Sequence, residues 1–511
     1  MASLRPKARV ARGATYLFVQ GFLNAVIGLV YFIILARTFS APSEQWQMGA
    51  FALLSFILTS IQVFGTFALP YAATKYIAQY VAEGDLKKAR AVVARVLQIG
   101  LLASAVAFVA LFVLAEWVSS LLFGTADQAL LLRLIALCFI FTNLNIEVSS
   151  FLQGIQRMRD VALVGIVYSV IHPLVGVFLL LSGWRLYAVV LAWLVGYLVA
   201  SVAGIILTVK HLGVLEKPYP IRPLMNFSLP LYVAGGIGFF VGWIDQLLLV
   251  SFMSLLYGAT EAQRILGIYY VAIRASTVPG LFSSSIITAL FPQLSELYAH
   301  QGFNSLKDSF RISARYSVLI GFPLIVGLAT LAYPVIILFA GWQYIEAITP
   351  LIIISVAALV GTLGVAIGPI LLTLERTTTM SLLSIVSCVL SAFLSYIALA
   401  YLGLGVIGTA WARTIASIIS LALSFYALKR YIPISFDKEP LWKASAASAF
   451  MVLAIVVVDL MRKFVSPESY QLLVIRLHLL PIYVVVGALA YFLALVALKA
   501  IKKHDVELVE E

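Results

Sequence analysis

Long apolar segments follow one another along almost the whole chain, and the short stretches between them hold most of the charged residues. A helix needs about 20 mostly apolar residues to cross a bilayer, and 14 segments of the chain are about this long. The pattern therefore predicts an all-α polytopic membrane protein with 14 transmembrane helices. The predicted spans are residues 14–37, 46–69, 91–115, 128–150, 161–182, 186–209, 226–255, 266–291, 313–339, 347–373, 379–401, 404–428, 443–461 and 472–498.

The composition excludes a soluble protein. Hydrophobic residues make up 63% of the chain and charged residues 11%, with a mean hydropathy of +1.06. Soluble domains contain about 45–50% apolar residues and about 25% charged residues. A membrane barrel would show alternating segments of about ten residues instead of long apolar runs. Cys138 and Cys388 both lie in apolar runs, so they indicate neither a disulfide framework nor a metal cluster.

The positive charges predict the orientation in the membrane. With the N-terminus inside, 24 Lys and Arg residues fall in cytoplasmic segments and 6 in outside segments. Cytoplasmic loops carry an excess of these residues, so both termini are predicted to be cytoplasmic. The net charge of +12 then reflects topology and attraction to an anionic inner leaflet, and no nucleic acid partner is needed.

The chain repeats itself at an offset of 218 residues. The segment around Gly49 matches the one around Gly267, and Trp193 aligns with Trp411. Several segments in one register indicate an internal duplication of six helices.

Because six spans are an even number, both halves have the same orientation, and parallel repeats of this kind surround an axis along the membrane normal. We expect an N-lobe at 1–220, a C-lobe at 221–432, and two extra helices with a cytoplasmic tail at 433–511. Rocking of the lobes would open a cleft on the axis to alternate sides of the membrane.

The connections leave no room for catalysis. They are too short for a soluble domain, and the chain has no GxxxxGK[ST] loop for nucleotide and no metal-ligand spacing. We therefore predict a transporter without cofactor or bound metal, and not an enzyme.

Charged residues inside a membrane are functional hypotheses by default. Asp245 in the seventh span and Arg274 in the eighth are both predicted about 12–15 Å below the outer surface. The two helices are sequential and antiparallel, so the side chains can meet. They either lock the helices together as a static ion pair or line the cavity and separate during transport.

Four basic residues are predicted to hold an anionic substrate. Arg413 lies deep in the twelfth span, and its repeat mate is Val195, so duplication alone does not require it. An arginine in an aqueous cleft binds phosphate through a bidentate fork, although Arg413 could instead pair with a neighbouring helix. Arg274, Arg37 at the outer end of the first span and Lys75 at the cytoplasmic end of the second complete the set.

A second group is predicted to bind a coupling ion, H⁺ or Na⁺. Asn143 and Glu147 share one helix face at spacing i, i+4; they form a cation or proton site, or only interhelical hydrogen bonds. His172 precedes Pro173, which disrupts the helical hydrogen-bond ladder, so the imidazole either bonds a freed carbonyl or relays protons. Asp245 completes this group.

Several stretches resemble prokaryotic polysaccharide and oligosaccharide flippases, such as O-antigen flippases, of the multidrug/oligosaccharidyl-lipid/polysaccharide exporter superfamily. Asp245 matches the helix-7 aspartate of that family, Gly267–Tyr269 its "GxY", Pro292 and Glu296 its "FPxxSE", and Arg37 its "AR". The stretches are "GATYLFVQGFLNAVIGLVYFIILARTF", "FSLPLYVAGGIGFFVGWIDQLLL", "LGIYYVAIRAS" and "ITALFPQLSELYAHQG".

The resemblance implies two six-helix lobes plus two helices in the cell membrane of a prokaryote. It implies translocation of an isoprenoid-(pyro)phosphate-linked oligosaccharide to the outer leaflet, coupled to an ion gradient or the membrane potential. Membrane lipids and the lipid-linked oligosaccharide are then the partners, with a functional link to glycosyltransferases, and we expect a monomer. The alternatives are a cation-coupled multidrug extruder, a flippase for the peptidoglycan lipid precursor, and a scaffold for glycan enzymes.

Overall fold

The structure is a computed structural model, and its described part consists of helices and turns without a strand. Its residues group into two compact units, Met1–Gly267 and Ile268–Glu511. These units are defined by packing, whereas the predicted lobes are defined by the internal repeat. The lobe boundaries at residues 220 and 432 therefore stay a prediction. The structure describes residues 6–213, 215–280, 303–374, 376–432, 438–465 and 480–500.

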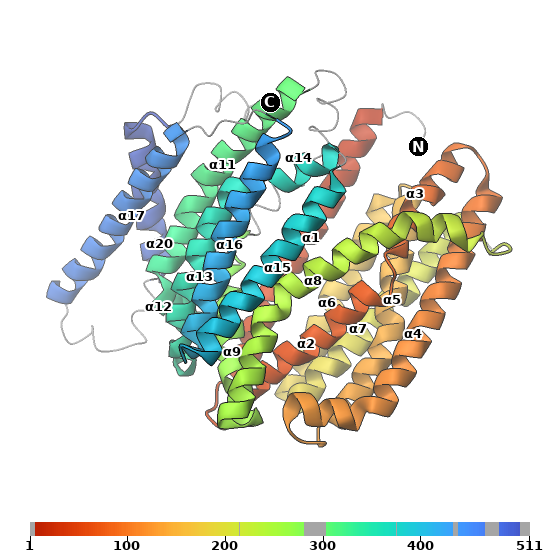
Figure 1. Ribbon diagram of the computed structural model, residues 1–511, viewed down its shortest axis with the longest axis horizontal. Helices are drawn as coiled ribbons and strands as arrows, with labels where there is room; N and C mark the ends of the chain where they lie inside the picture. The colour runs from red at the N-terminus through yellow and green to blue at the C-terminus, as the bar shows by residue number, and fades with distance from the viewer. Residues whose placement is uncertain are drawn as a thin grey trace. The chain divides into compact units, whose positions relative to one another are not determined.

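The first unit is a bundle of long helices joined by short turns (Figure 1). Neighbours in sequence pack together: α4 on α5 and α6 on α7, while α5 also packs on α7 and α1 on α6. Helix α8 contacts α2 and α3 and is visibly bent in Figure 1; it contains Pro230, which removes a helical hydrogen bond. The helices are α1 (Pro6–Thr38), α2 (Trp46–Phe64), α3 (Leu69–Ala82), α4 (Leu86–Phe123), α5 (Ala129–Gly154), α6 (Met158–Leu181), α7 (Arg185–Leu212), α8 (Ile221–Tyr257) and the first part of α9 (Ala259–Ser276).

Two glycines of the repeat bring α2 and α9 together. A Cβ added at Gly267 would lie 2.9 Å from the backbone nitrogen of Gly49, so only glycine permits this approach. The two glycines are repeat mates at the offset of 218 residues. The positions that revealed the duplication therefore meet at a backbone-to-backbone crossing.

The second unit repeats much of this packing. At the repeat offset, α4 corresponds to α11 and α12, α5 to α13 and α14, and the α6–α7 pair to α15–α16. Accordingly α15 packs on α16, α13 on α16, and α11 on α13. The helices are α11 (Phe303–Thr330), α12 (Ala332–Ala340), α13 (Ile348–Gly361), α14 (Ile367–Thr373), α15 (Thr377–Ala400), α16 (Gly405–Lys429), α17 (Lys438–Val465) and α20 (Leu480–Ala497).

The two helices outside the repeat, α17 and α20, pack on each other and on α11. The Tyr491 hydroxyl donates to the Leu319 carbonyl at 2.8 Å, and Arg315 donates to the Ala500 carbonyl at 2.9 Å. The extra pair is thus fixed to one helix of the second unit.

The predicted all-α membrane fold is confirmed, and 13 of the described helical segments are long and apolar enough to cross a membrane. They follow the predicted order. The remaining predicted span, 266–291, lies partly outside the described residues, and α9 covers its start. The count of 14 spans stays a prediction.

Some predicted spans are broken rather than continuous. The second predicted span, 46–69, is helical only as α2, which ends at Phe64. A turn in which Phe67 and Ala68 have positive φ follows, and a separate helix, α3, begins at Leu69 and runs beyond the predicted end. Pro70, which lacks an amide hydrogen, stands in the first turn of α3, where none is needed. The predicted span 347–373 is likewise divided by a 3₁₀ turn at Thr362–Gly364.

Candidate functional site

A buried polar cluster lies between α4 and α5 in the first unit. Glu147 on α5 is 1% exposed, and its carboxyl group lies against Gly100 of α4. One turn earlier on α5, the Asn143 side-chain amide donates to the Ser104 hydroxyl at 2.8 Å. That hydroxyl donates in turn to the Gly100 carbonyl at 2.7 Å. The predicted neighbours Asn143 and Glu147 therefore contact the same turn of α4.

The cluster is not fully satisfied by the protein. None of the ion pairs among the described residues involves Glu147. Asn143 Oδ1 and Thr142 Oγ1 are buried and have no hydrogen-bond partner in the described part of the chain. An ionised carboxylate in such a place is very costly, so the arrangement suits a group that takes up a proton or a small cation.

Three basic residues of α3 and α4 are candidate partners of Glu147 by position, and each makes its contacts with other groups. Arg95 Nε donates to the Tyr219 carbonyl at 2.6 Å, and Arg90 Nε donates to the Leu212 carbonyl. Lys75 on α3 is exposed and contacts an aromatic ring. No cation among them neutralises Glu147.

His172 belongs to a separate aromatic group between α1, α6 and α7. Its ring stacks on Tyr168 at a centroid distance of 5.3 Å and meets Tyr31 edge-on at 4.8 Å. Tyr168 stacks on Tyr197, whose hydroxyl accepts a hydrogen bond from Gln62 at 3.0 Å. The His172 Nε2 and the Tyr31 hydroxyl are buried without a hydrogen-bond partner among the described residues. The proton-relay role of His172 stays a prediction.

Lys75 lies in an aromatic setting at the end of the first unit that is predicted to be cytoplasmic. Its ammonium group is 4.1 Å from the centroid of the Phe227 ring of α8 and 5.5 Å from that of Tyr76. An aromatic ring carries no net charge, so it attracts the ammonium group without compensating its charge. Within the described residues Lys75 has no carboxylate partner, so it can attract an anion.

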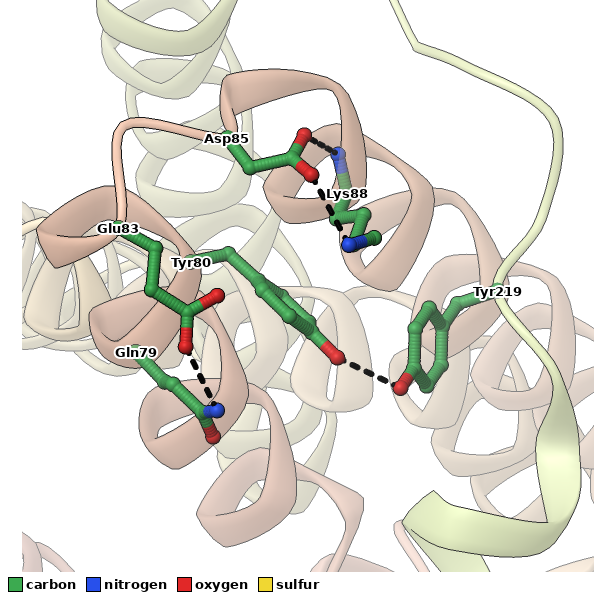
Figure 2. Close-up of polar contacts among 6 residues, drawn as sticks. All are labelled: Gln79, Tyr80, Glu83, Asp85, Lys88 and Tyr219. Atoms are coloured by element: carbon green, nitrogen blue, oxygen red, sulfur yellow. Dashed lines mark hydrogen bonds and ion pairs between the residues drawn. The ribbon is translucent and has the colours of Figure 1, made fainter.

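The linker between α7 and α8, residues 215–220, is fixed to the same end. Figure 2 shows the hydroxyls of Tyr80 and Tyr219 in contact, at 2.7 Å. Beside them, Asp85 caps α4 by accepting from the Lys88 backbone N–H at 3.0 Å and pairs with the Lys88 ammonium at 3.1 Å (Figure 2). The bond from the backbone of Lys88 lowers the pKa of Asp85, and burial raises the pKa of Tyr80.

The remaining predicted residues are distributed over both units. Asp245 on α8 is fully buried, and Arg37 at the end of α1 is exposed. Arg274 is exposed, and its guanidinium donates to the Tyr270 hydroxyl one turn earlier, at 2.8 Å from Nε. Arg413 on α16 is half-buried. The proposed Asp245–Arg274 pair joins the two units and stays a prediction. Pro292 and Glu296 lie outside the described residues.

Comparisons with known proteins identify the family. Residues 10–298 match the family described as "polysaccharide biosynthesis protein", which is more than half of the 511 residues. The chain belongs to this family. A curated relative is the probable low-salt glycan biosynthesis flippase Agl15 of Haloferax volcanii, 23% identical over 444 residues, or 86% of this chain and 88% of the relative.

Solved structures share the fold. A lipid II flippase MurJ in an inward closed conformation matches with a TM-score of 0.70 at 18% identity, covering 94% of this chain and 97% of that one. An outward-facing multidrug resistance MATE family transporter matches with a TM-score of 0.64 at 14% identity, covering 82% and 95%. At such identities the likeness shows the fold alone. Together with the family, it supports a membrane flippase or transporter, and the prediction that the chain is not an enzyme is confirmed.

The sequence predicted the candidate residues but not the residues that they contact. Gly100 and Ser104 are small residues spaced four apart on α4, a spacing that marks close helix contacts in membranes, and this signal could have found them. Phe227 beside Lys75 has no such signal, because it lies 152 residues away in sequence.

Proposed function

We propose that the chain is a flippase that moves an isoprenoid-(pyro)phosphate-linked oligosaccharide from the cytoplasmic to the outer leaflet by alternating access. The observation that carries the proposal is the match to a glycan biosynthesis flippase along 86% of the chain. The family description, polysaccharide biosynthesis, agrees with such a substrate. The host membrane would be the cell membrane of a prokaryote, with both termini in the cytoplasm.

The headgroup would be held by Lys75, Arg274, Arg413 and Arg37. A pyrophosphate that leaves water must be neutralised, because an isolated buried charge is very costly. Lys75 and Arg274 support the proposal best, since each is exposed and neither has a carboxylate partner among the described residues. Lysine would act as a point charge and arginine as a fork.

Coupling would use the buried cluster of Glu147 and Asn143, with a proton as the ion. The cluster offers one carboxyl group and one amide, whereas a dehydrated metal cation needs several oxygen ligands. His172 and Asp245 are the further candidates for the coupling path. Protonation would neutralise the buried Glu147 carboxylate. The proton would be released when the α4–α5 interface opens to water.

The test uses purified full-length protein in proteoliposomes with a fluorescent isoprenoid-pyrophosphate-linked N-acetylglucosamine. Wild-type protein should make the inner-leaflet pool accessible to an impermeant reagent, faster when a pH gradient is imposed. Lys75→Met should slow the rate about tenfold or more, as expected for the loss of a charged contact. Lys87→Met is the matched control, because Lys87 is exposed in the first turn of α4, and it should flip at the wild-type rate.

The competing functions are outcomes of the same experiment. Transport of ethidium without movement of the lipid-linked sugar would identify a multidrug extruder. Movement of the peptidoglycan lipid precursor in preference to the simple lipid-linked sugar would identify a precursor flippase. No transport of any of the three would indicate a scaffold for glycan enzymes. We also propose a monomer linked functionally to glycosyltransferases, which must supply the finished glycan.

A further inference from the structure

A pocket of about 670 Å³ opens in the first unit, at the end opposite the Tyr80–Tyr219 contact. Its walls come from the start of α2, the start of α5, and the turn between α6 and α7 together with the start of α7. Pockets for small organic ligands have about this volume. The lining residues include Trp46, Gln47, Gln128, Trp184, Arg185 and Tyr187. By the charge bias of the sequence this is the outer end.

One buried polar group in the wall has no partner. Gln47 is 4% exposed, and its side-chain Oε1 is buried without a hydrogen-bond partner among the described residues. A buried amide oxygen left in this way costs about 1–3 kcal/mol. Because Oε1 itself is enclosed by the protein, a 180° turn of the side-chain amide would bring it to the pocket, where a hydroxyl or amide donor on a ligand would satisfy it.

The pocket is electrically balanced. Its one charged lining residue, Arg185, forms an ion pair with Glu44. The remaining polar lining groups are neutral, namely the amides of Gln47 and Gln128 and the hydroxyls of Ser182 and Tyr187. Such a wall favours a neutral ligand rich in hydroxyls over a phosphate, which needs an uncompensated cation.

The aromatic residues complete the chemistry. The indoles of Trp46 and Trp184 and the phenol of Tyr187 line the same pocket, and Trp184 is 51% exposed. Aromatic rings offer a broad apolar face and a polar edge. A pyranose ring has matching surfaces, because its C–H groups gather on one face and its hydroxyls at the rim.

We propose that this pocket binds a neutral hexose or N-acetylhexosamine unit of a glycan at the outer end of the first unit. The ring packs on Trp184, and a sugar hydroxyl or acetamido N–H donates to Gln47 Oε1. The source of the sugar rests on the proposed function, since a flipped oligosaccharide arrives at this side. The pocket would then retain the sugar end of the product while its lipid stays in the membrane.

The test is saturation-transfer NMR on detergent-solubilised full-length protein with free glucose, galactose, mannose and N-acetylglucosamine. At least one sugar should give ring-proton signals with wild-type protein. Trp184→Ala should reduce them about three- to tenfold, and Gln47→Leu about fivefold. Leucine replaces an amide that already lacks a partner, so Gln47→Leu should fold. Trp117→Ala is the matched control, because Trp117 is 63% exposed on α4 and does not line the pocket.

Three results would overturn the proposal. They are the absence of any sugar signal in the wild type, signals in both pocket variants as strong as in the wild type, and signals only from a short-chain phosphatidylglycerol, which would make the site a lipid headgroup site. The flipping assay separates this proposal from the proposed function. Flipping without sugar binding refutes the pocket alone, and sugar binding without flipping refutes the transport function alone.

Discussion

Replacing Gly100 with alanine tests the geometry of the α4–α5 cluster directly. A Cβ at this position would overlap Glu147 Oε1, its nearest neighbour, and would lie 2.5 Å from the carboxyl carbon of Glu147 and 3.0 Å from its Oε2. Carbon atoms pack at about 3.5–4.0 Å, so the carboxyl carbon must move by at least about 1 Å, and Oε1 by more. Its helix is fixed by packing on five other helices of the first unit, α2, α3, α4, α6 and α7, which leaves little room for the shift.

The size of the effect follows from two opposing contributions. Overpacking a well-packed interior costs about 1–3 kcal/mol, and alanine regains about 0.5–1 kcal/mol of the helix penalty of glycine. Gly28→Ala is the matched control, because a Cβ there meets nothing within 4 Å. The free energy of unfolding of Gly100→Ala should therefore lie about 1–3 kcal/mol below that of Gly28→Ala.

The assay is reversible unfolding in mixed micelles, followed by tryptophan fluorescence. Adding Glu147→Ala to Gly100→Ala should restore stability, because the truncated side chain leaves space for the new methyl group, whereas Glu147→Gln keeps the volume and the clash. Equal stability of Gly100→Ala and Gly28→Ala would refute the placement of Glu147 against α4. The placement would also be refuted if Gly100→Ala combined with Glu147→Ala had the same free energy of unfolding as Gly100→Ala combined with Glu147→Gln.

Three further predictions follow. Tyr80→Phe and Tyr219→Phe should each lower the free energy of unfolding by about 1 kcal/mol and be non-additive in a double-mutant cycle; additive losses would exclude their hydrogen bond. The lowered pKa of Asp85 means that its cap stabilises the fold above its ordinary pKa of 3.8 and is lost as pH falls through the lowered value. The stability difference between wild type and Asp85→Ala should therefore shrink below about pH 4 in acid unfolding. In a chain without native cysteines, Gly84→Cys should react only from the cytoplasm and Asp127→Cys only from outside; outside labelling at position 84 would reverse the topology.

The spans were predictable because their apolar length is a local property of the sequence. The early end of the second span, at Phe64 instead of residue 69, was not predictable, because Pro70 marks only the start of the next helix, α3. A proline at the start of α3 fits either a continued kinked helix or a new one, and the choice depends on the turn at Phe67 and Ala68, whose positive φ values no local pattern indicates. Tertiary packing of α3 on α4 and α5 decides the outcome.

The candidate site was predictable only along single helices. The spacing of Asn143 and Glu147 placed them on one face, and the structure places both against α4. Which face of α4 they meet depends on how the two helices rotate about their axes, and the sequence of α5 holds no information on that. Predictions that cross between the units, such as Asp245 with Arg274, depend on still more distant packing and remain predictions.

The last prediction concerns Arg95, which ties the linker to the helix that carries the polar cluster. Its Nε donates to the Tyr219 carbonyl at 2.6 Å, while the Tyr219 N–H donates to the Ala91 carbonyl at 2.9 Å. Arg95 and Gly100 are five residues apart on α4, or about 7.5 Å along a rigid helix. Movement of the linker would therefore be transmitted to the level of the carboxyl group.

Arg95→Met should remove a hydrogen bond from a charged donor, worth about 1.5–3 kcal/mol, and release the linker. Hydrogen exchange at the Tyr219 amide should then rise about tenfold or more, and flipping should depend less on the pH gradient. Lys87→Met is the control, because Lys87 is exposed in the first turn of α4. Unchanged exchange at Tyr219 would show that α4 and the linker are held together by other contacts. Faster exchange with an unchanged response to the gradient would show that the linker does not act on the cluster.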